Sequence, residues 1–300
     1  MGKTDIHLHL STGPCMQKMG GGKTTYASGT TPHETVLKLS GVREMLPHLR
    51  ELGIRRGILM SAGESGSVCN ETVRRAAAME PDVYAWMCNV DETAPETLEE
   101  RLARYKAQGA VGVGEFAVNR WISDPLIQAV FAAAEKTGLP VLFHMSPEEG
   151  FNYGIADRPG LPLLEEALRK YPDLIFVGHS QPFWHEMSAD AAPDNAARNS
   201  WGSGPVVPGG RLAHLFETYG NLYGDLSANS GGMAVMRDEP YGLWFLEAYQ
   251  DRLMFGTDMT NTEMEFPLGR WLDQQLAQGR LPQKVYDKIC FENARRVFGI

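Results

Sequence analysis

Short apolar runs recur along the whole chain and give the clearest structural signal in the sequence. Each run is about four to eight residues long and almost uninterrupted by polar residues, as expected for strands that are buried on both faces. We therefore predict strands at these seven runs, residues 55–60, 83–90, 110–116, 140–144, 174–179, 222–227 and 253–256. Residues 3–10 are interpreted as a short first strand, which makes eight strands.

Amphipathic segments lie between these runs. Their apolar residues recur at helical spacing, and several of them begin with a proline in the first turn, where its fixed backbone angle suits a helix. The predicted helices are at residues 68–80, 95–108, 125–137, 162–170, 210–219 and 241–249, with a further amphipathic stretch that begins near Ser40 and a closing helix at 282–298.

The alternation of strands and helices decides the fold class. Successive strand–helix units require a parallel sheet, and eight of them in 300 residues favour a closed (β/α)₈ TIM barrel over a doubly wound sheet. No low-complexity linker or charge block divides the chain, so we predict one domain over residues 1–300.

Two connections are longer than usual, at residues 11–32 and 187–208, and long loops on a barrel more often serve a site. The segment from Gly20 to Thr24 resembles the end of a phosphate-binding loop, but that motif requires glycine where the chain has Gln17. We interpret residues 11–32 as a flexible loop over the barrel mouth, with Lys23 as a candidate contact to an anionic substrate.

Composition narrows the class of partner. The net charge of −9 argues against affinity for nucleic acid or an anionic membrane, so a small polar molecule is the expected substrate. The four cysteines are widely spaced and are interpreted as reduced thiols. Without an apolar signal or membrane-spanning run, we expect a cytoplasmic protein, and the sequence leaves homo-oligomer formation open.

Two histidines at the end of the first predicted strand are the first candidates for chemistry. His7 and His9 are separated by one apolar residue, so their side chains project to the same face, about 6.6 Å apart along the strand. A single histidine there is usually structural, whereas a pair preceded by Asp5 more often binds a metal.

Polar residues that can bind metals also end four other predicted strands. In a parallel barrel these ends converge on one mouth. Imidazoles and carboxylates crowded into one small volume would remain badly desolvated unless a cation organised them. The residues are Glu115, His144, His179 and Asp258.

This set resembles the amidohydrolase superfamily, and in particular its amidohydrolase-related family, which includes decarboxylases, hydratases and lactone hydrolases. The resemblance covers essentially the whole chain. Besides the metal-competent strand ends, four local stretches carry it: VGHSQPFW at 177–184, NLYGDLSA at 221–228, DRLMFGTD at 251–258 and ENARRVF at 292–298.

The resemblance implies a role for each residue. His7, His9, His144 and Asp258 match the ligands of one catalytic metal, and His179 matches an acid–base histidine. In two-metal members Glu115 would bridge two ions, with His144 and His179 on the second. Many relatives carry a carboxylated lysine where this chain has Glu115, so one or two ions remain open, and we favour two.

Zinc is the expected ion, with manganese, iron or nickel as alternatives. The resemblance implies that the metal activates water, with Asp258 as the base and His179, if it binds no metal, as a further proton carrier or polarising group. We predict a metal-dependent hydrolase of a small ester, lactone or amide. A one-metal decarboxylase or hydratase is the first alternative, and a non-catalytic binding barrel is the second.

Several other residues are weaker candidates for the site, and each also has an ordinary structural interpretation. Glu115 could instead pair with Arg120, and Asp225 could orient a histidine or contact substrate. Arg120 and Arg198 are candidates for holding a substrate carboxylate, and Trp184, Trp201 and His185 for reaching the pocket. His48 and His214 lie in helical stretches and are expected to be ordinary surface or half-buried residues, and His33 also lies outside the strand ends.

Overall fold

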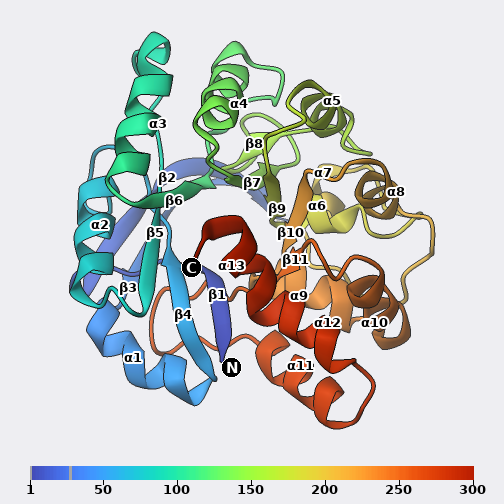
Figure 1. The fold of residues 1–300 in the computed structure, drawn as a ribbon. Coiled ribbons are helices and arrows are strands. Elements are labelled where there is room, and N and C mark those ends of the chain that lie inside the picture. Colours follow the sequence, from blue (N-terminus) through green and yellow to red (C-terminus); the bar gives the residue numbers. More distant parts are fainter. Residues whose placement is uncertain (1, 27–28) are drawn as a thin grey trace.

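The computed structural model describes residues 2–26 and 29–300, with the side chains of residues 18–35 left aside. Its main sheet is a barrel of parallel strands, which confirms the predicted (β/α)₈ fold (Figure 1). In barrel order the strands are β1 (Lys3–Leu8), β4 (Ile54–Leu59), β5 (Tyr84–Cys88), β6 (Ala110–Phe116), β7 (Val141–Ser146), β9 (Phe176–His179), β10 (Leu222–Asp225) and β11 (Leu253–Met254).

Hydrogen bonds between the first and last strand regions close the barrel. The backbone N–H of Ile6 donates to the carbonyl of Phe255 at 3.1 Å, and that of Asp258 donates to the carbonyl of His7 at 2.8 Å. The N–H of His9 donates to the carbonyl of Met259 at 3.0 Å. Residues at the two ends of the sequence are thereby brought side by side at the mouth.

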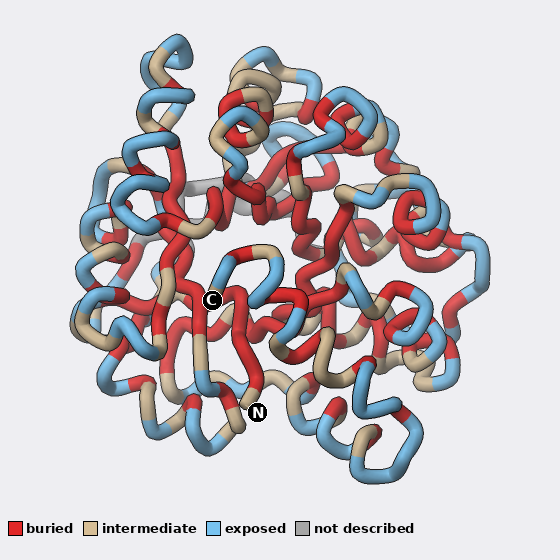
Figure 2. Tube along the Cα trace, viewed as in Figure 1, coloured by how far each residue is buried: buried red, intermediate tan, exposed pale blue. Residues whose placement is uncertain are grey.

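Helices surround the barrel, and their outer faces are exposed while the strands are buried (Figure 2). The predicted helices are confirmed as α1 (Val42–Glu51), α2 (Asn70–Met79), α3 (Leu98–Ala107) after a 3₁₀ turn at Pro95–Thr97, α4 (Pro125–Thr137), α5 (Pro162–Lys170), α8 (Arg211–Thr218) and α10 (Glu239–Ala248). No helix among the described residues is long and apolar enough to cross a bilayer.

Several helices were not predicted, and the closing helix is interrupted. Residues 282–298 form α12 (Gln283–Asp287), a π-helical segment at Lys288–Glu292 and α13 (Asn293–Phe298). The unpredicted helices are α6 (Gln181–His185), α7 (Asn195–Arg198), α9 (Ala228–Met236) and α11 (Leu268–Ala277). Two of them, α6 and α7, have five and four residues, and α9 contains two glycines, which disfavour a helix.

The prediction of a loop at residues 11–32 is wrong. The segment forms β2 (Cys15–Tyr26), which pairs antiparallel with β3 (Gly29–Leu39) as a separate two-stranded sheet. Its glycine- and threonine-rich sequence lacks the apolar run of a barrel strand, so strand structure here comes from pairing within the hairpin. Lys23 and His33 lie in this hairpin, but their side chains are outside the described part of the structure.

One end of the barrel interior is filled by apolar side chains. Strand residues of this inner cluster pack against Ala294 and Phe298 of α13, which lies over the N-terminal ends of the strands (Figure 1). The strand residues are Ile6, Ile58, Met60, Met87, Leu142, Val177, Tyr223 and Met254. This packing leaves the opposite, C-terminal mouth as the end at which polar groups gather.

The polar side chains of the site lie on the same strands, in the next layer toward their C-terminal ends. Leu142 and Val177 belong to the inner cluster, and His144 and His179 follow them by two residues on the same face. Strand β1 departs from strict alternation, because Ile6 joins the inner cluster although the next residue, His7, belongs to the polar layer. The pairing of β1 with β4 shifts register between Asp5 and Leu8, which is the kind of irregularity that redirects a side chain.

Candidate metal centre

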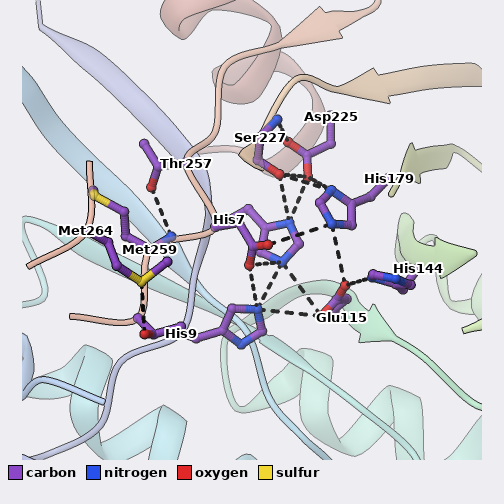
Figure 3. A network of polar contacts seen from close by, with 12 residues as sticks. His7, His9, Glu115, His144, His179, Asp225, Ser227, Thr257, Met259 and Met264 are labelled. Atoms are coloured by element: carbon purple, nitrogen blue, oxygen red, sulfur yellow. Dashed lines mark hydrogen bonds and ion pairs between the residues drawn. The ribbon is translucent and has the colours of Figure 1, made fainter. Parts of the chain in front are cut away.

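Glu115 lies at the centre of the polar layer, between two pairs of histidines (Figure 3). Its Oε1 lies 2.7 Å from His144 Nδ1 and 3.7 Å from His179 Nε2. Its Oε2 lies 3.5 Å from His9 Nε2 and 3.8 Å from His7 Nε2. The two carboxylate oxygens therefore face different histidine pairs.

Asp258 contacts the histidines from the last strand region. Its Oδ1 lies 3.1 Å from His9 Nε2 and 3.5 Å from His7 Nε2, and its Oδ2 lies 3.9 Å from His179 Nε2. The residue has φ of +63°, in the left-handed region that is costly for most residues but tolerated by aspartate. The side chain is 28% exposed, more than the carboxylate of Glu115, so it can meet a molecule entering the mouth.

Asp225 fixes two of the histidines from behind. Its Oδ2 accepts a 2.7 Å hydrogen bond from His7 Nδ1 and lies 3.1 Å from His179 Nδ1, while Ser227 Oγ donates to the same oxygen at 2.6 Å (Figure 3). With Nδ1 engaged, both imidazoles direct Nε2 towards Glu115 and Asp258. The expectation that Asp225 orients a histidine matches this geometry, and the carboxylate does not line the cavity beside the site.

Gly256 leaves the space that this arrangement needs. A Cβ on Gly256 would lie 2.8 Å from Asp225 Oδ1 and 3.0 Å from Ser227 Cβ. Any larger residue would push the carboxylate away from the histidines. Asp5, also buried, accepts hydrogen bonds from the N–H groups of His7 and Thr257, so it holds the backbone of the two strand ends together.

The imidazoles and carboxylates of the centre stabilise one another's charged forms, although they are buried. Burial favours the neutral forms, yet the imidazoles of His144 and His7 hold the pKa of the Glu115 carboxyl well below its usual value. His7 and His9 likewise lower the pKa of Asp258, and hydrogen bonds from His179 and His7 lower that of Asp225. The carboxylates of Asp258 and Asp225 raise the pKa of His7. The acids are thus anionic in the folded protein.

The donor set fits a divalent cation. Ligand atoms of three groups lie within 4.8 Å of one another: His7, His9 and Glu115; Glu115, His144 and His179; and His7, His179 and Asp258. Imidazole nitrogen and carboxylate oxygen are typical zinc ligands, and donors around one ion at about 2.0–2.2 Å necessarily lie this close to one another. His144 directs Nδ1 to the centre, 2.7 Å from Glu115 Oε1, and its buried Nε2 has no hydrogen-bond partner among the described residues.

The fold therefore brings together the six candidate ligands predicted from the sequence. The alternative prediction, that Glu115 pairs with Arg120, is wrong. Arg120 pairs with Glu92 at 2.7 Å and with Asp124 at 3.4 Å, at the surface. It does not pair with Glu115. An ion pair with Glu92 also removes Arg120 as a free contact for a substrate carboxylate.

The other secondary candidates lie away from the centre. Arg198 is buried and donates to the carbonyls of Pro147 and Asp157, so it braces loops. His185 donates to the carbonyl of Ala192, and Trp184 is buried and donates to the carbonyl of Asp225. Trp201 is exposed, as is His214, and His48 donates to the carbonyl of Met264.

A cavity of about 480 Å³ opens beside the centre. His9 and Glu115 form its floor, and small apolar residues supply much of the wall. The lining residues beyond these two are Gln17, Ser61, Ala62, Val68, Asn89, Val90, Asp91, Glu92, Ala117, Val118 and Tyr153. A volume of this order suits a small molecule.

Two lining residues were missed by sequence reasoning. Asn89 donates to the carbonyls of Glu115 and Ser61, at 2.6 and 3.1 Å, and so ties the end of β6 to the neighbouring strands. Tyr153 places its ring 4.2 Å from that of His144. The position of Asn89 directly after a strand was an available signal, whereas Tyr153 lies in a loop without any motif.

Comparison with known proteins supports this picture at the level of family and fold. A model of the family described as Amidohydrolase matches residues 4–300. A solved candidate 2-pyrone-4,6-dicarboxylic acid hydrolase from Pseudomonas putida is 17% identical, with a TM-score of 0.60 and coverage of 99% of this chain and 97% of that one. No curated protein matches the chain.

Two decarboxylases of known structure share the fold. The 2,6-dihydroxybenzoate decarboxylase from Rhizobium is 17% identical with a TM-score of 0.57, covering 100% of this chain and 99% of that one. The 5-carboxyvanillate decarboxylase from Novosphingobium aromaticivorans, solved with manganese and 4-hydroxy-3-methoxy-5-nitrobenzoic acid, is 16% identical with a TM-score of 0.56, covering 85% and 79%.

Proposed function

The chain belongs to the amidohydrolase family, and on that premise we propose that this enzyme is a metal-dependent hydrolase of a small ester, lactone or amide, with two divalent cations. The observation that carries the proposal is the position of Glu115. One of its oxygens faces His144 and His179 and the other faces His7 and His9, as a carboxylate that bridges two ions would. Zinc is the proposed metal, given the histidine-rich donor set.

The proposed ligands are divided between two positions. His7, His9 and Asp258 would hold one ion, His144 and His179 the other, and Glu115 both. Cations held there would lower the pKa of coordinated water to about 7 and would polarise a substrate carbonyl. Asp225 would keep His7 and His179 in the orientation that this binding needs.

Asp258 is the proposed base. Its carboxylate lies 3.1 Å from His9 Nε2 and is partly exposed, so it would accept a proton from the attacking water. The water oxygen then bonds to the carbonyl carbon. Asp258 returns the proton to the leaving oxygen or nitrogen as its bond to that carbon breaks, so that the carboxylate is regenerated at the end of the cycle.

A one-cation lyase is the second candidate. In this case His7, His9, His144 and Asp258 would hold a single ion, as the family resemblance implies, and His179 would stay free to transfer a proton. Asp258 Oδ1 lies 3.1 Å from His9 Nε2 and 3.5 Å from His7 Nε2. Two of the structures with this fold are decarboxylases. Decarboxylation or hydration at one ion would then replace hydrolysis.

Metal content and one substitution test the proposal. Mass spectrometry of zinc-loaded protein should find two ions per chain, and Glu115→Gln should reduce the number to one, because an amide cannot bridge two cations as a carboxylate does. Asp258→Asn should lower kcat on a cleaved ester or lactone by about a hundredfold or more, through loss of the base. One ion per chain in the unaltered enzyme, with release of carbon dioxide from an aromatic acid, would contradict the hydrolase and favour the lyase.

A further inference from the structure

The cavity beside the metal centre contains chemistry that the proposed hydrolysis does not use. Gln17 comes from β2 of the separate hairpin, and Asp91 follows the barrel strand β5. Both line the cavity together with His9 and Glu115. We propose that Gln17 and Asp91 form a recognition wall for a substrate arm that ends in an ammonium group, an inference that rests on the proposed function for the reaction at the other end of the substrate.

Gln17 offers an unused acceptor. Its side chain is 7% exposed, and its buried Oε1 has no hydrogen-bond partner among the residues that the structure describes. A buried carbonyl oxygen without a partner is unfavourable, because it has lost its hydrogen bonds to water and gained none in return. Gln17 lines the cavity, and on this proposal a donor on a bound molecule supplies the missing hydrogen bond.

Asp91 supplies a negative charge without a cationic partner among the described residues. Its Oδ1 accepts the N–H of Glu64 at 2.9 Å, and its Oδ2 lies 3.4 Å from Ser65 Oγ. These neutral donors hold the carboxylate in place but leave its charge uncompensated. The nearby acids differ, since Glu64 pairs with Arg101 and Glu92 with Arg120.

The rest of the lining agrees with an amphipathic cation. Valines and alanines supply apolar contact for the body of the substrate, and no lysine or arginine occurs among the lining residues that the structure describes. A substrate arm that ended in a carboxylate would be repelled by the Asp91 carboxylate and by the carbonyl oxygen of Gln17. The Pseudomonas putida structure is named for a dicarboxylic acid, so on this inference the two proteins differ in the arm they select.

Hydroxamates with different arms test the wall, because the hydroxamate head binds a metal whereas the arm extends into the cavity. The probes are 4-aminobutanehydroxamate, butanehydroxamate and succinic monohydroxamate, titrated calorimetrically into zinc-loaded protein. The ammonium arm should bind about five- to tenfold more tightly than the methyl arm, the gain expected from one partly exposed charge pair with hydrogen bonds. The carboxylate arm should bind more weakly than either.

Variants localise the effect. Asp91→Asn should abolish the advantage of the ammonium arm and leave the affinity for butanehydroxamate unchanged. Asp82 is exposed and precedes β5, at the end of the strand opposite to Asp91. The control variant Asp82→Asn removes the same charge there and should leave the affinities for all three probes unchanged. Gln17→Leu should weaken the ammonium probe about threefold, the effect of one hydrogen bond, and Gln17→Glu should strengthen it.

Failure of the wall and failure of the metal chemistry give different results. A carboxylate preference that disappears in Lys23→Ala would overturn the inference, as would an ammonium preference unchanged by Asp91→Asn. Butanehydroxamate affinity that does not depend on zinc would contradict the metal-dependent reaction. In that event the recognition wall is tested without the metal, by NMR titration of wild type and Asp91→Asn with benzylammonium and with benzyl alcohol. Equal affinities of the wild type for the two probes would overturn the inference.

Discussion

The two ends of the barrel interior are built from the same strands but differ in chemistry. At the N-terminal end Leu142, Val177 and Tyr223 pack against α13, whereas two residues later on the same strands stand His144, His179 and Asp225. One layer is apolar and filled, and the next is charged and borders a cavity. The barrel thus separates stability from chemistry along its axis, as barrel enzymes generally do.

The largest expected effect comes from removing the histidine pair at the mouth. His7→Ala with His9→Ala should abolish metal binding and lower activity by about a thousandfold or more, because two ligands of the centre are lost together. The inner cluster is untouched, so circular dichroism should still show a folded barrel. Metal analysis and activity are measured on the same sample, and activity that survives loss of the metal would contradict the mechanism.

Phe298→Ala tests the opposite end. The ring is 6% exposed and packs in the inner cluster, so its removal should lower the free energy of unfolding by about 4 kcal/mol. Urea unfolding measures this loss. Zinc content per folded molecule should stay unchanged, and a variant that lost metal while keeping its stability would show that the two ends are not separate.

Asp157 shows that a buried acid near the mouth need not belong to the centre. It accepts hydrogen bonds from the N–H groups of Arg158, Leu163 and Leu164, but burial, the larger effect, raises its pKa to about 6. The unfolded chain releases this proton near pH 4 and the folded protein near pH 6. The free energy of unfolding should therefore fall as pH rises through that window, by up to about 3 kcal/mol.

Asp157→Asn should remove that slope without affecting zinc binding. Thermal or urea unfolding of the variant and the wild type between pH 4 and pH 6, with zinc content measured alongside, checks both expectations. An identical slope in the two proteins would assign the pH dependence to other groups.

The smallest effect is expected behind the histidines. Asp225→Asn keeps the shape of the side chain but cannot accept hydrogen bonds from His7 and His179 as a carboxylate does. Zinc affinity, measured by competition with a chelating dye, should fall about ten- to a hundredfold, the usual effect of losing an orienting partner. The same substitution at exposed Asp82 is the control. Unchanged affinity would mean that packing alone orients the imidazoles.

The prediction of the barrel succeeded because most of its strands are short apolar runs, and the polar residues at their ends stand out against them. His144 after Leu142, or Asp258 after the run that begins at Leu253, is visible in the sequence alone. Hairpin β2–β3 was missed because its glycine-rich sequence has no apolar run, and its strands are held by pairing with each other rather than with the barrel.

The sequence by itself determined the fold class and the candidate ligands, because hydrophobic periodicity and the polar residues that end apolar runs are properties of the chain. Only the tertiary structure decided which oxygen of Glu115 faces which histidines, that Asp225 serves two of them, and that Arg120 is paired elsewhere. Those contacts join residues up to 218 positions apart. Their geometry depends on how closed strands bring distant ends together, which no local pattern encodes.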